Sequence, residues 1–143
     1  MRVRIARVDP NLPLPQYATA GAVGIDLITR ETTTVPPGAV ALVPGNVVLT
    51  TPPGCMWLVA ARSSTPRRKG LFVPHGVGII DQDYCGPDDE VKVQVWNPSD
   101  APIVVERGER IAQAILVRIE KAEWDESDQQ PTVPTRGGFG STG

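Results

Sequence analysis

Proline and glycine interrupt this sequence at short intervals, and no other feature limits its fold as much. Pro (15) and Gly (14) together make up about a fifth of the 143 residues. Proline lacks the N–H group that a helix interior needs, and glycine favours tight turns, so long helices are excluded. Short apolar runs between turn residues are instead typical of an all-β protein. A chain of this length is expected to form one domain with its own core.

The apolar runs themselves predict where the strands lie. Val91, Val93 and Val95 alternate with polar or amphipathic residues, which predicts a strand with one buried face. Further strands are expected around residues 3–5, 24–28 and 56–61, and at 111–119, where both faces are apolar and a doubly buried strand is predicted. Two Pro-Pro-Gly triplets enclose the runs 39–43 and 47–49, which are predicted to pair as a hairpin around Pro44-Gly45-Asn46.

Charge and hydropathy exclude several classes of partner. The formal net charge is -2 and the sequence pI is about 5.4, so the chain has no global basic field and is not expected to bind nucleic acid. No stretch reaches the ~18 apolar residues of a membrane span, and the first residues lack the apolar core of a secretion signal. A cytoplasmic protein without a membrane partner is expected. Cys55 and Cys85 lack the spacing and histidine neighbours of a zinc site and are predicted to be free thiols.

Two neighbouring stretches carry opposite charge. Residues 61–80 contain four cations and no acid, and residues 81–90 contain five acids. This order suits a site that binds a polyanion and places a carboxylate or a divalent cation against it, although two solvated loops would look the same. Arg62-Ser63-Ser64 follows an apolar strand, and a guanidinium beside hydroxyls is a natural phosphate contact.

The segment 76–86 has the strongest catalytic pattern. Gly76 and Gly78 allow the backbone to approach a ligand closely. Asp81 follows two isoleucines, so we expect its carboxylate to be partly desolvated and suited to act as a general base; an aspartate that caps a turn is the alternative. His75 could in principle join Ser63 and Asp81 in a hydrolytic triad, but no nucleophile elbow is present.

The end of the chain differs in composition from the rest. Residues 1–125 are predicted to form a β domain, and residues 126–143 a flexible, Gly-rich C-terminal arm that closes over an active site. Phe139 could stack on a base, and Ser141 and the backbone N–H groups could contact phosphates. A plain flexible linker is the alternative.

In this order, five segments resemble the five motifs of the trimeric deoxyuridine triphosphatases (dUTPases): 22–27, 62–64, 78–86, 108–113 and 137–143. The resemblance implies a jelly-roll-like β-sandwich (the dUTPase-like β-clip) that forms a homotrimer with shared active sites. It also implies an enzyme, a dUTP diphosphatase, that hydrolyses dUTP to dUMP and pyrophosphate with Mg²⁺.

The resemblance also implies a role for each candidate residue. Asp81 matches the carboxylate that activates the water attacking the α-phosphorus, and Tyr84 matches the tyrosine that packs under the deoxyribose and excludes a 2′-hydroxyl. The remaining matches are His75 to Gly78 for uracil, Arg62, Ser63 and Ser64 for the phosphates, Gln113 for the α-phosphate region, Asp26 for Mg²⁺ through water, and Arg136, Phe139, Gly140 and Ser141 for the closing arm.

The sequence departs from the family pattern at Pro134 and at His75, which stands where many relatives have a small or amide residue, and it leaves two rival functions open. The arginine that usually stands five residues before the fifth-motif phenylalanine is Pro134 here, and Arg136 is the nearest cation. A dCTP deaminase, or a bifunctional deaminase and dUTPase, has the same fold, but its catalytic glutamate falls on Gln94, and an amide cannot shuttle protons. A non-catalytic nucleotide-binding β-sandwich module is the second rival.

Overall fold

The chain folds into short strands joined by turns, with one helical turn. The computed structural model describes residues 1–135 and 137–138. The strands are β1 (Ile5–Arg7), β2 (Ile25–Leu27), β3 (Thr33–Val35), β4 (Val40–Pro44), β5 (Val47–Leu49), β6 (Cys55–Ala61), β7 (Gly78–Ile80), β8 (Lys92–Trp96), β9 (Ile103–Val105) and β10 (Ala112–Arg118). The helix α1 spans Thr65–Lys69. The expectation of an all-β protein is therefore confirmed.

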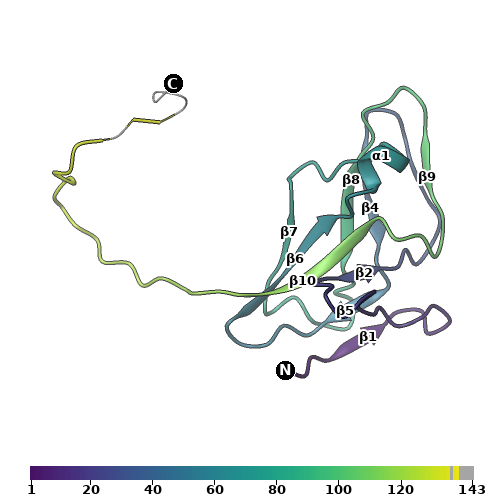
Figure 1. Cartoon of the computed structure of the whole chain (residues 1–143), viewed down its shortest axis with the longest axis horizontal. Helices are drawn as coiled ribbons and strands as arrows, with labels where there is room; N and C mark the ends of the chain where they lie inside the picture. The colour runs from purple at the N-terminus through teal and green to yellow at the C-terminus, as the bar shows by residue number, and fades with distance from the viewer. Residues whose placement is uncertain (136, 139–143) are drawn as a thin grey trace.

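A four-stranded antiparallel sheet in the order β2-β10-β6-β7 organises the domain, and β10 and β6 cross its centre in Figure 1. These two strands pair along their full length, from Ala112 opposite Ala61 to Arg118 opposite Cys55. Three two-stranded pairs complete the fold: β1 with β5, β3 with β9, and β4 with β8. β10 thus joins β2, near the start of the chain, to β6 in its middle.

The predicted hairpin between residues 39–43 and 47–49 is wrong. β4 pairs with β8, and β5 pairs with β1. At the turn, the backbone N–H of Gly45 donates to the carbonyl of Val91, and the N–H of Val91 donates to the carbonyl of Val47, both at 2.8 Å. The turn residues therefore bond to a distant segment. Local turn chemistry was a correct sign of a chain reversal, but it did not determine which strands pair.

The core is built from the buried faces of these strands. Val91, Val93 and Val95 are almost fully buried, as their alternation predicts, and Trp57, Val59 and Leu71 pack in the same cluster. On β10 only Ala112 and Ala114 are buried, whereas Ile115 and Val117 on the other face are half-buried in the single chain. Double burial of this strand is therefore not achieved within one chain.

After β10 the chain leaves the domain. Residues 120–135 are exposed and contain no helix or strand, and they extend away from the sheets in Figure 1. The indole of Trp124 is 92% exposed there. Arg136, Phe139, Gly140 and Ser141, which were expected to close the active site, lie outside the described residues. In the described part of the chain, no helix has the length and apolar character needed to cross a membrane.

Candidate active site

The central sheet brings three of the predicted phosphate-site residues together. Gln113 on β10 lies directly opposite Asp26 on β2, and Arg62 follows the end of β6. The guanidinium Nε of Arg62 is 3.1 Å from Oδ1 of Asp26. The backbone N–H of Arg62 also donates to the carbonyl of Ile111 at 3.0 Å, which holds the start of this loop against β10. Motifs separated by as many as 87 positions thus form one cluster, which we call the phosphate end.

Cations surround the cavity beside this cluster. The cavity has a volume of about 170 Å³ and is lined by Arg62, Ser64, Thr65, Arg68, Lys69, Glu109, Arg110 and Ile111. Lys69 is paired with Glu109 at 2.8 Å, so the remaining guanidiniums leave the cavity with an excess of positive charge. Ser64 precedes α1 and its hydroxyl makes no capping hydrogen bond with the helix. Ser63, the neighbouring predicted residue, is exposed. The cavity suits an anionic ligand.

Sequence reasoning missed Arg110 as a member of this cluster. Its Nη1 lies 3.6 Å from Oδ2 of Asp26, and its backbone carbonyl accepts a hydrogen bond from Nη1 of Arg62 at 3.1 Å. Arg110 stands inside the motif at 108–113, two positions after a glycine and three before Gln113. Its place in that motif was the only signal that could have identified it.

The predicted uracil-binding residues lie at β7. Gly78 pairs with Val59 of β6. Gly76 has a positive φ of 78°, a backbone conformation that would be strained in a residue with a side chain. His75 and Gly78 line a cavity of about 280 Å³ together with Leu42, Val59, Val73, Ile79, Ile80, Lys92, Val93 and Gln94. This apolar and backbone-rich lining suits a planar base read by main-chain groups. Gln94, at the position of the deaminase glutamate, faces the same cavity.

Asp81 follows β7 directly, but its carboxylate is exposed in the single chain. The expectation that two isoleucines would desolvate it is wrong here, because the last paired residue of β7 is Ile80 and Asp81 lies beyond the end of that edge strand. The backbone carbonyl of Asp81 accepts hydrogen bonds from Thr51 Oγ1 and from the N–H of Tyr84, both at 3.4 Å. Asp81 lines a cavity of about 360 Å³ whose wall includes Lys121.

Tyr84 lies one turn after Asp81 and is held at its far end. The phenol donates a hydrogen bond to the backbone carbonyl of Glu90 at 3.1 Å. Burial, and after it the nearby carboxylates of Asp89 and Glu90, raise the pKa of Tyr84 above its usual value. The phenol therefore stays protonated and able to donate. We call the group of His75, Gly78, Asp81 and Tyr84 the nucleoside end.

Within one chain Gln113 of the phosphate end and Asp81 of the nucleoside end do not meet. Along β6, the residue opposite Gln113 is Ala60, whereas continuation of the β7 register places Asp81 opposite Met56. Four residues of strand correspond to about 13 Å, and Gln113 and Asp81 are also two strands apart, so their separation is about 16 Å. His75 and Asp81 line different cavities, and Ser63 lines neither of them, so the described residues assemble no Ser-His-Asp triad from these three side chains.

Residues 87–90, for which the sequence suggested no role, have a structural one. The carboxylate of Glu90 is buried and receives hydrogen bonds from Arg30 and from the backbone N–H of Asn46. Oδ2 of Asp89 accepts from the N–H of Gly86 at 2.7 Å. Two of the five acids of the acidic stretch therefore fix the loop that follows Tyr84. Neither pairs with the preceding basic stretch in the described salt bridges.

The expected Mg²⁺ site is supported by a single carboxylate, that of Asp26. Among residues 1–135 and 137–138, no group of three or more His, Cys, Asp or Glu side chains is placed to hold a metal ion. Asp26 is the acid of the phosphate end, and each of its oxygens faces a guanidinium. This arrangement does not fit a metal cage made of protein groups. It fits a hydrated Mg²⁺ held mainly by substrate phosphates, with Asp26 reaching it through water.

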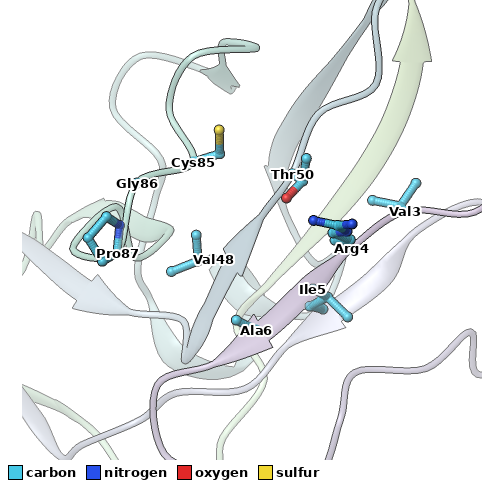
Figure 2. A pocket seen from close by; sticks show the side chains of 9 residues that line it. All are labelled: Val3, Arg4, Ile5, Ala6, Val48, Thr50, Cys85, Gly86 and Pro87. Atoms are coloured by element: carbon cyan, nitrogen blue, oxygen red, sulfur yellow. The ribbon is translucent and has the colours of Figure 1, made fainter.

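A larger cavity is lined by residues of neither end. It has a volume of about 590 Å³ and opens between β1, β5 and the loop at 85–87 (Figure 2). Arg4, Thr50 and Cys85 provide its polar groups. None of the candidate site residues lines it. Cys85 is exposed and Cys55 is buried, and both are free thiols, as expected.

Comparison with known proteins agrees with the motifs. The dUTPase family model matches residues 10–143. The deoxyuridine 5′-triphosphate nucleotidohydrolase of Thermobifida fusca (strain YX) is 40% identical over 145 residues, spanning 100% of this chain and 79% of that protein. The crystal structure of the dUTPase from Streptococcus mutans has a TM-score of 0.78 at 35% identity and covers 84% of this chain and 98% of that one. The dUTPase from phage phi11 of S. aureus, in a structure that describes a structural Mg(II) ion, shares the fold with a TM-score of 0.78 at 20% identity, over 90% of this chain and 98% of that one. The family model covers most of the chain and the relative spans all of it, so the chain belongs to the dUTPase family.

Proposed function

We propose that the chain hydrolyses dUTP to dUMP and pyrophosphate, and that its active site joins the phosphate end of one subunit to the nucleoside end of another. The observation that carries this proposal is the cluster of Asp26, Arg62 and Gln113 beside a cationic cavity, with the Asp81 carboxylate and a base-sized cavity along β7, the opposite edge strand of the sheet. The family relationship supports dUTP as the substrate.

The chemistry divides among a few side chains. Asp81 accepts the proton of the water that attacks the α-phosphorus, and it must lie within ~3 Å of that water. Arg62, Ser63 and Ser64 bind the phosphates and offset the charge that develops during transfer, while Gln113 orients the α-phosphate region. Tyr84 packs under the deoxyribose. The backbone from His75 to Gly78 reads uracil, so the imidazole contributes little.

A homotrimer explains the separation of the two ends. Asp81 and Gln113 are about 16 Å apart in one chain, yet both must reach the same α-phosphate. Assembly of three copies with closed symmetry would place the nucleoside end of one subunit against the phosphate end of its neighbour. The half-buried face of β10, with Ile115 and Val117, is available for such packing.

Mg²⁺ and the C-terminal arm complete the proposed site. When bound, Mg²⁺ neutralises charge on the triphosphate, and Asp26 holds it through water. We propose that residues 126–143 form an arm separate from the β domain at 1–125. Arg136, Phe139, Gly140 and Ser141 would cover the substrate and exclude water, with Arg136 in place of the arginine that Pro134 replaces.

Pyrophosphate release from dUTP, dCTP, dTTP and UTP tests the function. We expect turnover of dUTP that Mg²⁺ increases and a chelator abolishes. A chain that ends at Pro134 keeps every strand found in the described residues, since β10 ends at Arg118, and should lose turnover while keeping its thermal unfolding temperature. Ammonia release from dCTP would establish the deaminase instead. Binding of dUTP without hydrolysis would favour the non-catalytic module.

A further inference from the structure

The loop after Tyr84 ends at an unusually well-anchored residue. Glu90 is 6% exposed, and its carboxylate accepts three hydrogen bonds. Oε1 accepts from Arg30 Nε at 2.9 Å and from the backbone N–H of Asn46 at 2.9 Å, and Oε2 accepts from Arg30 Nη2 at 3.0 Å. Arg30 follows β2 and Asn46 lies between β4 and β5, so two distant segments hold this side chain.

The anchored residue in turn holds Tyr84. The phenol donates to the backbone carbonyl of Glu90 at 3.1 Å. The peptide that follows is fixed as well, because the N–H of Val91 donates to Val47 and its carbonyl accepts from Gly45, each at 2.8 Å. The position of the Glu90 carbonyl is therefore set by contacts that do not involve Tyr84. Tyr84 as a residue is 37% exposed, which leaves surface free for a ligand.

We propose that the Arg30–Glu90 ion pair is a positioning device for Tyr84, and that it sharpens the enzyme's selection of deoxyribose over ribose. The inference rests on the proposed function, in which the ring of Tyr84 excludes a 2′-hydroxyl. A ring can reject one extra oxygen atom only if it cannot move aside. The hydrogen bond to Glu90 prevents that movement, and the ion pair keeps its acceptor in place.

Two variants remove this anchor from opposite ends. Tyr84→Phe keeps the ring and deletes the hydroxyl that donates to Glu90. The double variant Arg30→Met/Glu90→Leu removes both charges together, which avoids leaving a buried charge unpaired and is often tolerated. We measure kcat/KM for dUTP and for UTP well below the unfolding temperature. Each variant should raise the UTP-to-dUTP ratio about five- to tenfold, the range that one lost hydrogen bond supplies.

The combination of the two changes separates positioning from general stability. If the ion pair acts through the phenol, the triple variant should show the same ratio as Tyr84→Phe alone. Ser99→Ala is the control, because it removes the hydrogen bonds from Ser99 Oγ to Asn97 Oδ1 at 2.7 Å and to the carbonyl of Ala101 at 2.9 Å, which involve neither Arg30, Tyr84 nor Glu90. This control should lower the unfolding temperature and leave the ratio unchanged.

Each possible result supports or overturns the proposed positioning of Tyr84 by the ion pair. A double variant that is less stable but keeps the wild-type ratio, while Tyr84→Phe changes it, overturns the positioning role and leaves the proposed function intact. An unchanged ratio in Tyr84→Phe as well removes the phenol anchor from sugar selection. A wild-type protein that hydrolyses no dUTP refutes the proposed function, and this inference with it.

Discussion

Mixing two inactive variants should restore activity, because the phosphate end and the nucleoside end of one chain cannot serve the same substrate. Asp81→Asn removes the proposed base, and Gln113→Ala removes the α-phosphate contact. The two residues lie about 16 Å apart in one chain, whereas a general base must lie within ~3 Å of the attacking water. A site would therefore take Asp81 from one subunit and Gln113 from another.

Statistics of random assembly give the size of the effect. In an equimolar mixture, a site receives an intact Asp81 with a chance of one half and an intact Gln113 from the other subunit with the same chance. About a quarter of the sites should then be intact, and the mixture should recover about a quarter of wild-type activity. If each site belonged to one chain, no intact site would form.

The assay is pyrophosphate release from dUTP after the two variants are denatured together and refolded. A mixture of Asp81→Asn with the double variant Asp81→Asn/Gln113→Ala is the matched control, since every chain in it lacks the base and no site can recover. Activity equal to the sum of the two separate variants would refute the shared-site reasoning. It would require the two ends to meet within a single chain.

Three further predictions follow from the site. Asp81→Asn should reduce kcat by about 10²- to 10⁴-fold with dUTP binding retained in calorimetry, whereas the exposed neighbour changed in Asp83→Asn should have little effect. Gly24→Ala should lower activity, and it should lower the free energy of urea unfolding by about 1–3 kcal/mol, because the new Cβ would lie 3.0 Å from Oε1 of Gln113. Gly21→Ala is the control, since no atom lies within 4 Å of its new Cβ. Tyr84 should ionise above its usual pH of ~10, so its contribution to stability is present below that pH and lost as the pH rises through the higher folded-state pKa; an ultraviolet titration of wild type against Tyr84→Phe measures this.

Local patterns predicted the elements better than their partners. The alternation at Val91, Val93 and Val95 gave a strand with one buried face, because a period of two is a property of the strand itself. The turn at 44–46 was also recognisable, but the strands around it pair with β8 and β1. Partner choice depends on which arrangement buries Val43 and Val47 together, and that depends on the whole chain.

The site shows the same difference between what local patterns predict and what depends on the whole chain. The residue types at Asp26, Arg62, Asp81 and Gln113 were evident from motifs, since phosphate binding and general-base chemistry need guanidinium, amide and carboxylate groups. The exposure of Asp81 was not evident from the sequence. A carboxylate is desolvated by the approach of neighbouring surfaces and not by two adjacent isoleucines. The ion pair of Glu90 was not evident either, because its partner Arg30 lies 60 positions away in the sequence.

Turn residues, strand periodicity and side-chain chemistry are local properties, and they were enough to predict an all-β protein and the chemical groups that it can bring to a nucleotide. Three features needed the folded structure: β10 lies between β2 and β6, Gln113 and Asp81 stand near opposite ends of β6, and Tyr84 donates to the carbonyl of Glu90, whose side chain is paired with Arg30. These features arise from contacts between distant segments, which form only where the whole core can be packed and its polar groups hydrogen-bonded.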